Sequence, residues 1–299
     1  MNILICGATG FVGRHLAARL ARAGHTLTGV ARHRERARHD WPQYGWVSGD
    51  YRHDLQAQDW LPRLRGLNYD AVINAVGILR GSGDQAFASL HTQAPQALFT
   101  AAREAGVPLI VQISALGAAD GITAYHRSKR AADETLASLG GRWQVLRPSL
   151  IQGPGGASTR LFLKQSALPL IPLVGAGDQR VQPVHVSDIA DAVLRLVEDP
   201  ALPSGIVHAV GPRAVTMREL YALYRRALGL GAARFLPTPL PLVQLAARLG
   251  DLSGLGPLSS ETLGMLLTPN VADPAPFAAL LGRAALAPEQ FFDADAGMS

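Results

Sequence analysis

Residues 3–13 are Ile3-Leu4-Ile5-Cys6-Gly7-Ala8-Thr9-Gly10-Phe11-Val12-Gly13, an apolar run followed by three glycines at intervals of three. The apolar run predicts a buried strand, and the pattern from Gly13 to Ala23 predicts a helix. Glycines where a strand passes into a helix allow a tight turn and a close backbone approach to a pyrophosphate, which the helix N-terminus attracts. The alternative is a glycine turn without a ligand. We expect a dinucleotide here, with contacts from Gly7, Thr9, Gly10, Phe11, Val12 and Gly13.

Short apolar runs alternate with helical patterns through the first half of the chain. The helical patterns cover residues 13–23, 85–104 and 124–139, between six candidate strands. Alternation at this spacing is typical of right-handed βαβ units and of a parallel sheet covered on both faces. The predicted fold class is α/β, a Rossmann-type doubly wound parallel sheet with a smaller, mainly helical C-terminal substrate subdomain. The candidate strands are residues 3–6, 26–30, 44–47, 71–75, 109–113 and 144–146.

Glycine and proline interrupt the pattern after residue 150. Residues 153–156 and 168–174 are predicted loops, and a short strand over 184–188 leads into a helix over 189–197. His185 is expected to be a packing residue and Asp188 a helix cap. A further strand is predicted over 206–210, and Thr216 and Glu219 form a capping box that opens the next helix. We therefore assign residues 1–150 to a dinucleotide-binding Rossmann core and 151–299 to a mixed segment. Within that segment, 181–198 are expected to return to the core and the rest to form the substrate subdomain.

Composition limits the class of protein and its partners. Of the 299 residues, 48% are hydrophobic and 17% are charged, which predicts a packed globular core. The single cysteine and the absence of a secretory signal or an 18-residue apolar stretch favour a cytoplasmic protein without a spanning helix. The net charge of +5 permits nucleic acid, an anionic membrane surface or a phosphorylated small molecule as partner. Because aromatics are few and no recognised motif is present, nucleic acid is not expected, and the scattered histidines predict no metal site.

The end of the second predicted strand bears on which dinucleotide binds. An NAD enzyme usually ends this strand with Asp or Glu, which holds the ribose hydroxyls of the adenosine. Here Val30-Ala31 is followed by Arg32-His33-Arg34, and two guanidinium groups can bind a 2′-phosphate bidentately. NADP(H) is therefore favoured and NAD(H) stays possible. The alternative is that residues 32–38 form a solvated basic loop.

In their order, the motifs resemble those of the extended and atypical short-chain dehydrogenase/reductases over residues 1–215. Within that superfamily, the chain is most similar to bacterial proteins that resemble the nucleotide-binding accessory subunit of respiratory complex I. Residues 113–117 and 148–156 carry the likeness to this branch. The motifs are the glycine turn, Gly49-Asp50-Tyr51, Asn74-Ala75-Val76-Gly77, Tyr125-His126-Arg127-Ser128-Lys129, Arg147-Pro148-Ser149 and Val184-His185-Val186-Ser187-Asp188.

The resemblance implies roles for these residues. Tyr125 would pass a proton to a substrate oxygen that Ser114 orients, and Lys129 would hold the nicotinamide ribose. Asp50 would accept a hydrogen bond from the adenine, and Pro148 would help to position the nicotinamide ring. Asn74, Ala75, Val76 and Gly77 would line the cofactor. Many relatives carry a catalytic asparagine in the helix before the fifth strand, where this chain has His91, which either replaces that group or is a partly exposed helix histidine.

Physical chemistry supports the pairing of Tyr125 with Lys129. The two residues are four apart, so they share one face of a helix. A cation about 4 Å from the phenol, at an effective dielectric of about 20, favours the phenolate by roughly 4 kcal/mol, or about three pKa units. We therefore expect the lysine to lower the pKa of the tyrosine toward neutrality. The interval of 11 residues between Ser114 and Tyr125 is short for the extended members, which leaves their geometry open.

Three functions follow from these motifs. The first is an NADP(H)-dependent oxidoreductase that interconverts a carbonyl and an alcohol in a small-molecule substrate. The second is a nucleotide-sugar epimerase or dehydratase with retained NAD, in which Arg160 or Arg180 would hold a substrate phosphate. The third is a non-catalytic NADPH-binding scaffold or assembly subunit that contacts a respiratory complex or a membrane surface. For the chain itself we expect a monomer or a homodimer.

Overall fold

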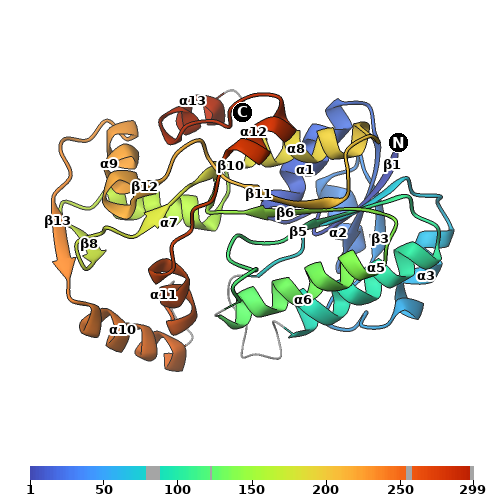
Figure 1. Ribbon diagram of the computed structural model, residues 1–299, viewed down its shortest axis with the longest axis horizontal. Coiled ribbons are helices and arrows are strands. Elements are labelled where there is room, and N and C mark those ends of the chain that lie inside the picture. The colour runs from blue at the N-terminus through green and yellow to red at the C-terminus, as the bar shows by residue number, and fades with distance from the viewer. Residues whose placement is uncertain (79–87, 122, 254–257, 297–299) are drawn as a thin grey trace. The chain divides into compact units, whose positions relative to one another are not determined.

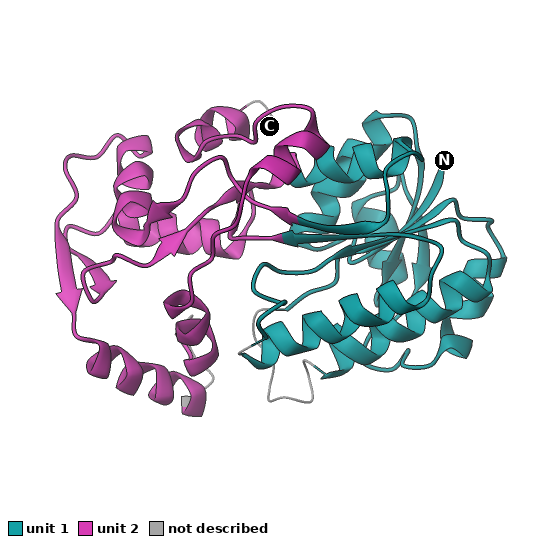
Figure 2. Cartoon of the chain, viewed as in Figure 1, with its two compact units in different colours: residues 1–147, 189–207 teal, residues 148–188, 208–299 magenta. Residues whose placement is uncertain are grey.

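The computed structural model describes residues 1–78, 88–121, 123–253 and 258–296, and Figures 1 and 2 show the chain and its two compact units. Unit 1 comprises residues 1–147 and 189–207, and unit 2 comprises residues 148–188 and 208–299. The segment that returns to the first unit is thus 189–207, against the 181–198 expected from the sequence. The substrate role of the second unit stays a prediction.

A seven-stranded sheet with the order β11-β6-β5-β4-β1-β2-β3 forms the centre of unit 1. Every pairing from β3 across to β6 is parallel. This order is that of a Rossmann sheet, in which the chain changes its direction of growth between β1 and β4, and ligands bind beyond the carboxyl ends of the strands there. The predicted fold class is therefore confirmed. The strands are β1 (Asn2–Cys6), β2 (Thr26–Ala31), β3 (Gly45–Ser48), β4 (Ala71–Asn74), β5 (Leu109–Ile113), β6 (Arg142–Pro148) and β11 (Gly205–Ala209).

Helices cover both faces of this sheet. In Figure 1, α1 (Phe11–Arg22) and α8 (Val186–Glu198) lie on one face, and α3 (Ala57–Arg65), α5 (Ala94–Glu104) and α6 (Ala124–Ser138) lie on the other. Leu4 and Cys6 of β1 pack in the same cluster as Trp60 of α3 and Leu98 of α5. Because both faces are covered, the strands are apolar on both sides. This is why continuous apolar runs, without alternation, predicted them.

Two helices of unit 1 were missed by the sequence analysis. They are α2 (Arg34–Asp40), which is almost wholly charged, and α3, which contains Pro62. Proline inside a helix removes a donor and argues against a helix in the sequence. In α3 a capping box between Gln56 and Asp59 satisfies the first turn, and Trp60 and Leu64 are buried. Tertiary burial of one face therefore outweighs the proline.

The predicted helix over residues 85–104 has two parts. Residues 88–93 form a π-helical turn, η1 (Ala88–Gln93), and α5 continues from residue 94. Residues 85–87 lie outside the described residues. Single π-helical turns within helices are rare and are frequent at functional sites. The turn here carries His91.

Unit 2 has a core of its own, in which Phe162 of α7 (Ala157–Ser166) meets Tyr221 and Tyr224 of α9 (Met217–Ala227). The capping box of Thr216 and Glu219 opens α9 as predicted. The other elements are β7 (Ile151–Gln152), β8 (Ile171–Val174), β9 (Arg180–Val181), β10 (Val184–His185), β12 (Val215–Thr216), β13 (Phe235–Thr238), α10 (Leu240–Ser253), α11 (Ser260–Leu267), α12 (Ala275–Leu281), η2 (Pro288–Gln290) and α13 (Phe291–Ala296).

The prediction of a loop over residues 168–174 was wrong in its second half. Residues 171–174 form β8, which pairs in parallel with β13 more than sixty residues later in the chain. Both strands contain a proline, Pro172 and Pro237, and proline is confined to sheet edges because it donates no ladder hydrogen bond. Each strand of a two-stranded ribbon is an edge strand, so the ribbon tolerates proline, the residue that had argued against a strand here.

His185 and Asp188 hold the C-terminal segment of unit 2. Nε2 of His185 lies 2.9 Å from Oδ1 of Asp295, and the carboxylate of Asp188 accepts from the backbone amide of Leu286 and pairs with Arg283 at 2.7 Å. The expectation that Asp188 is a helix cap was therefore wrong. Its carboxylate is fully buried and binds a distant segment of the chain.

Candidate cofactor and catalytic site

The predicted glycine turn joins β1 to α1 at the edge where the sheet changes its direction of growth. Gly7 has φ +81°, and a Cβ built on it would lie 2.9 Å from the carbonyl carbon and oxygen of Ala75, which follows β4. A Cβ on Gly13 would lie 2.0 Å from the carbonyl oxygen of Gly7. Side chains at these two positions would therefore collide with backbone, and only glycine permits the close packing of turn, helix and neighbouring strand.

The first turn of α1 is available for an anion. Gly10 stands at the N-cap, and no side chain caps the helix, whose first turn contains no acidic residue. The amide of Gly10 donates to the carbonyl of Gly7 at 2.9 Å, which closes the turn. The amides that follow point out of the helix end, where backbone N–H groups and the helix dipole favour a phosphate. The residues present therefore fit the diphosphate of a dinucleotide.

Arg32 and Arg34 lie where β2 passes into α2. Both side chains are exposed, and within the described residues neither guanidinium makes a hydrogen bond or ion pair. Arg34 is the first residue of a helix, so residues 34–38 are helical where the alternative expected a loop, and solvation of these side chains without a ligand stays the alternative. The groups are free to meet a 2′-phosphate, and their role in binding one stays a prediction.

The predicted adenine contact, Asp50, is already paired. Its carboxylate accepts from Nε of Arg52 at 3.0 Å and from Nη2 at 2.6 Å, and its pKa is held at about 2, mainly by this hydrogen bond. Its backbone amide donates to Oδ2 of Asp54 at 2.6 Å. Asp50 is therefore ionised at neutral pH, and a further ligand would have to share it with Arg52.

Asn74, the last residue of β4, organises the backbone at this edge. Its buried side chain accepts from the hydroxyl of Tyr51 at 2.9 Å and donates to Oε1 of Gln112 at 2.7 Å. Oδ1 of Asn74 also accepts from the amide of Val76 at 3.2 Å. These contacts fix the turn of Ala75, Val76 and Gly77 next to the glycine turn. Asn74 therefore positions this turn, and its contact with a cofactor stays a prediction.

Lys129 of α6 is buried beside this turn. Its Nζ donates to the carbonyl oxygens of Val76 at 3.2 Å and of Ile113 at 3.1 Å, at the carboxyl ends of β4 and β5. Burial lowers its pKa to about 8, against the opposing field of Asp133. The ammonium form thus still predominates at pH 7. The structure places this cation at the carboxyl ends of the central strands, where the cofactor of a Rossmann protein lies.

Tyr125 lies one helical turn before Lys129 and is also buried. Its ring makes edge contacts with His91, at 5.3 Å between centroids, and with His126, at 5.5 Å. Burial, and then the negative field of Asp133, raise the pKa of the phenol to about 12. The expected lowering by Lys129 was therefore wrong in direction, because the Coulomb argument left out the cost of burying the phenolate.

Ser114 follows β5 and is tied to a buried ion pair. Its hydroxyl donates to Oδ2 of Asp133 at 2.8 Å, and Nε of Arg147 donates to the same oxygen at 2.9 Å. Burial raises the pKa of Asp133, while Ser114 and Arg147 oppose the rise. Since the serine proton points at Asp133, the hydroxyl can accept a hydrogen bond from a ligand without moving. To donate one, it would have to leave Asp133.

The sequence analysis missed Asp133 and Arg147 as members of the site. Asp133 is four residues after Lys129 and so lies on the same helix face, a spacing that could have signalled it. Arg147 directly precedes Pro148 in a motif that had been noted for its other residues. Pro148 itself ends β6 and is buried.

His91 is the polar group of the π-helical turn, and the expectation of a partly exposed helix histidine was wrong. It is 1% exposed, and burial lowers its pKa to about 2, so it is neutral. Nε2 accepts from the amide of Ile78 at 2.9 Å, which leaves Nδ1 as the donor to the hydroxyl of Ser128 at 3.3 Å. Ser128 donates in turn to the carbonyl of Tyr125 at 2.7 Å. The histidine thus connects the turn after β4 to the helix that carries Tyr125.

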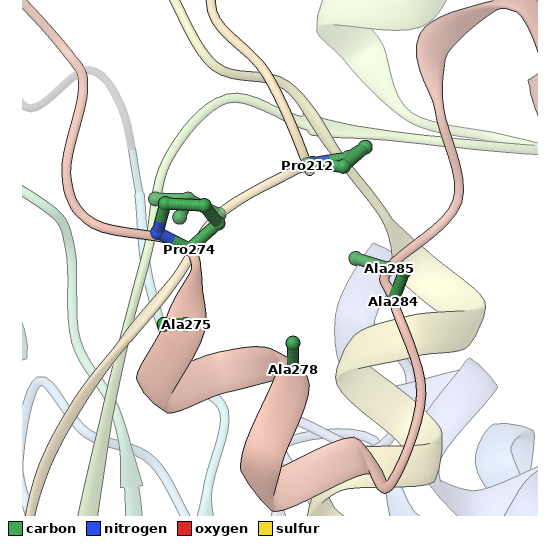
Figure 3. Close-up of a pocket in the computed structure, with 7 residues that line it drawn as sticks. Pro212, Pro274, Ala275, Ala278, Ala284 and Ala285 are labelled. Atoms are coloured by element: carbon green, nitrogen blue, oxygen red, sulfur yellow. The ribbon is translucent and has the colours of Figure 1, made fainter.

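Other possible sites carry less chemistry. Figure 3 shows a pocket of unit 2 whose lining side chains are all apolar: Val210, Pro212, Pro274, Ala275, Ala278, Ala284 and Ala285. Among the residues that the structure describes, no group of three or more His, Cys, Asp or Glu could hold a metal ion. In the same residues, no helix combines the length and apolar character needed to span a bilayer.

The fold and the glycine turn define a Rossmann protein of the short-chain dehydrogenase/reductase type. The chain belongs to the NAD dependent epimerase/dehydratase family, whose model matches residues 3–211. This family includes enzymes that use a nicotinamide cofactor, as its name states, and the match covers the whole of the site described above.

Two curated relatives illustrate the range of proteins similar to this chain. The mouse protein NADH dehydrogenase [ubiquinone] 1 alpha subcomplex subunit 9, mitochondrial, is 27% identical over 275 residues, which cover 86% of this chain and 68% of the mouse protein. The ceramide reductase of Caulobacter vibrioides is 29% identical over 203 residues, covering 67% of this chain and 62% of the reductase. The chain also matches an uncharacterised Mycobacterium tuberculosis protein, but the match covers only 23% of that protein's length.

Solved structures share the fold. Human epimerase family protein SDR39U1, solved with NADPH, aligns with a TM-score of 0.75 at 20% identity, covering 98% of this chain and 99% of the human one. MoeE5, solved with UDP-glucose and NAD, aligns with a TM-score of 0.69 at 20% identity over 100% of both chains. Structural neighbours therefore bind NADPH or NAD, and the likeness at this identity is one of fold.

Proposed function

We propose that this chain is an NADPH-dependent oxidoreductase that interconverts a carbonyl and an alcohol, with Tyr125 as the proton donor. The observation that carries the proposal is the position of Lys129. Its ammonium is held by carbonyl oxygens at the carboxyl ends of β4 and β5, one helical turn from Tyr125 and beside the turn that follows β4. The similarity to a ceramide reductase supports a reductase over other family activities.

The residues of the chain suit the reductive direction. NADPH, held by Gly7, Gly10 and Gly13 and by Arg32 and Arg34, would supply the hydride. Because the pKa of Tyr125 is about 12, its phenol is protonated at neutral pH and can give a proton to the oxygen of a carbonyl as negative charge develops there. The Lys129 ammonium would then stabilise the phenolate that remains.

The first test measures NADPH oxidation by the purified protein with a broad panel of ketones and aldehydes. Tyr125→Phe should lower kcat by about 100-fold or more, since general acid catalysis contributes on this scale. Melting temperature and the affinity for NADPH are measured for the same variant, so that a folding defect is recognised. Wild-type turnover that Tyr125→Phe leaves intact, or no turnover with any substrate, would remove the support for this function.

A scaffold function is the second candidate, and two observations favour it. The proton of Ser114 is committed to Asp133, and the chain matches the mouse subunit of a respiratory complex over 86% of its own length. A scaffold should bind NADPH without turning it over, and Tyr125→Phe should change nothing. Co-purification with a large complex, combined with NADPH binding and no turnover, would establish this function.

The epimerase or dehydratase function predicts a different bound state. Such an enzyme retains oxidised NAD, which denaturation of the purified protein would release. One candidate for a substrate phosphate, Arg160, is exposed, and its guanidinium donates to the carbonyl of Gly155 at 2.8 Å. Arg32 and Arg34 argue against this function because they favour a 2′-phosphate.

A further inference from the structure

A row of exposed leucines runs along α10 in unit 2. Val243 and Ala247 are buried against Leu263 of α11, so one face of the helix anchors it. The other face carries four leucines that are each more than half exposed. They are Leu242 (59%), Leu245 (57%), Leu249 (58%) and Leu252 (85%).

The spacing of these leucines makes one narrow stripe. Intervals of three, four and three residues at 3.6 residues per turn place all four side chains within an arc of about 80°. Arg248, which is exposed, borders the stripe at about 40° from its edge. An apolar stripe with arginine beside it is the pattern of a helix that lies in the interface of a membrane.

Further exposed leucines lie on loops of the same unit. Leu168 and Leu170 precede β8, and Leu228 and Leu230 follow α9. The guanidinium of Arg225 joins the two loops, because Nη1 donates to the carbonyl of Leu168 and Nε to that of Gly231, both at 2.8 Å. The exposed Leu236 lies on β13, which pairs with β8 and leads into α10. In Figure 1 these elements follow one another along the β8–β13 ribbon to α10.

Basic residues outnumber acidic ones around these leucines, and the acidic residue of α10, Asp251, accepts from the backbone amide of Ser260 at 3.0 Å. Residues 160–177 contain Arg160 and Lys164 and no acidic residue, and residues 220–250 contain four arginines and no acidic residue. Of these six basic side chains, five are exposed: Arg160, Lys164, Arg226, Arg234 and Arg248. The same segments therefore offer apolar side chains and an excess of positive charge.

From this juxtaposition we infer that the leucine-rich surface of unit 2, defined by α10 and the loops at residues 168–170 and 228–230, binds an anionic lipid bilayer. Leucines enter the interface between headgroups and acyl chains, while arginines pair with anionic headgroups. A second copy of the chain is a poorer occupant. A twofold interface sets a surface against itself, so it would bring together side chains among which basic residues outnumber acidic ones. This inference does not depend on the proposed function.

The test is vesicle co-sedimentation with the full chain. Vesicles of phosphatidylcholine alone are compared with an equal mixture of phosphatidylcholine and phosphatidylglycerol, at low and at high salt. Wild-type protein should bind the mixed vesicles, and each arginine near the surface should contribute about fivefold to the partition coefficient, an effect that salt weakens. Leu245→Glu/Leu249→Glu should lower partition by about tenfold or more.

A matched variant separates this surface from general charge. Leu67→Glu/Ile206→Glu adds the same charge at exposed apolar residues of unit 1 and should change partition by less than about twofold. The four positions are on the surface, so the fold should survive in both variants. Melting temperature and NADPH binding are measured to check this. Equal binding to neutral and anionic vesicles, or unchanged partition in Leu245→Glu/Leu249→Glu, would overturn the inference. A dimer in sedimentation analysis that this variant dissociates would assign the surface to a second copy and also overturn it.

Discussion

Replacement of Gly13 by alanine tests the site on which the proposed function depends. The added Cβ would lie 2.0 Å from the carbonyl oxygen of Gly7 and 2.7 Å from its carbonyl carbon, far inside any contact that atoms can make. Both neighbours are backbone, so α1 must move away from the turn. Overpacking of this kind costs about 1–3 kcal/mol of folding stability. The movement also displaces the helix amides that would bind the diphosphate.

Thermal unfolding with and without NADPH measures both effects. At about 100 times its Kd, a ligand adds about 2.7 kcal/mol of stability to the wild type. We expect Gly13→Ala to weaken binding at least tenfold, which at the same NADPH concentration lowers that gain to about 1.4 kcal/mol, and a hundredfold loss leaves about 0.4 kcal/mol.

Gly24→Ala is the matched control for this experiment. Gly24 follows α1 with φ +87°, and a Cβ there meets nothing within 4 Å. The substitution should cost about 1 kcal/mol through backbone strain alone and leave the NADPH gain intact. If Gly13→Ala keeps the wild-type gain, or if Gly24→Ala loses it equally, then the turn after β1 does not hold the cofactor and the reasoning fails.

Three further variants test other parts of the site. Arg32→Ala/Arg34→Ala should weaken NADPH by about tenfold or more and leave NADH unchanged, since each charged hydrogen bond is worth about 1.5–3 kcal/mol; equal losses for both cofactors in titration would contradict a 2′-phosphate site. Arg147→Met should destabilise the fold by about 3–5 kcal/mol, because it strands the buried Asp133. The folded-state pKa of Asp133 is already raised and would rise further in the variant, so the difference in unfolding free energy from wild type should be smallest in acid and should widen as pH rises above the folded-state pKa of wild-type Asp133. His91 has a pKa of about 2 when folded, so the wild type should lose about 1.4 kcal/mol per pH unit as pH falls below about 6.5. His91→Asn should flatten this acid limb in urea titrations, and an unchanged limb would show that other groups cause it.

The pKa of Tyr125 shows where local reasoning reached its limit. The spacing of Tyr125 and Lys129 predicted that both lie on one face of a helix, and in the structure both belong to α6. Burial then set the protonation states, with the pKa of the phenol raised to about 12 and that of the ammonium lowered to about 8. Burial depends on everything that packs around α6, including β5 and the turn after β4, and no short segment contains that information.

Other errors share this cause. The strand at residues 171–174 pairs with residues 235–238, and the sequence analysis missed it because Pro172 argued against a strand. The carboxylate of Asp188 binds residues 283 and 286 instead of capping a helix. In each case a contact between residues far apart in the chain outweighed the local preference, because burial of a strand edge or a charge is costly without a partner.

What the sequence by itself determined is the part of this protein that local physics dictates. Continuous apolar runs specified the buried strands, and glycines at residues 7, 10 and 13 specified the turn, because a Cβ at Gly7 or Gly13 would collide with backbone. Only the tertiary structure decided which polar groups meet: Ser114 and Arg147 with Asp133, and His91 with Ser128. The physical reason is that backbone geometry is set over a few residues, whereas burial and charge pairing are set by the whole fold.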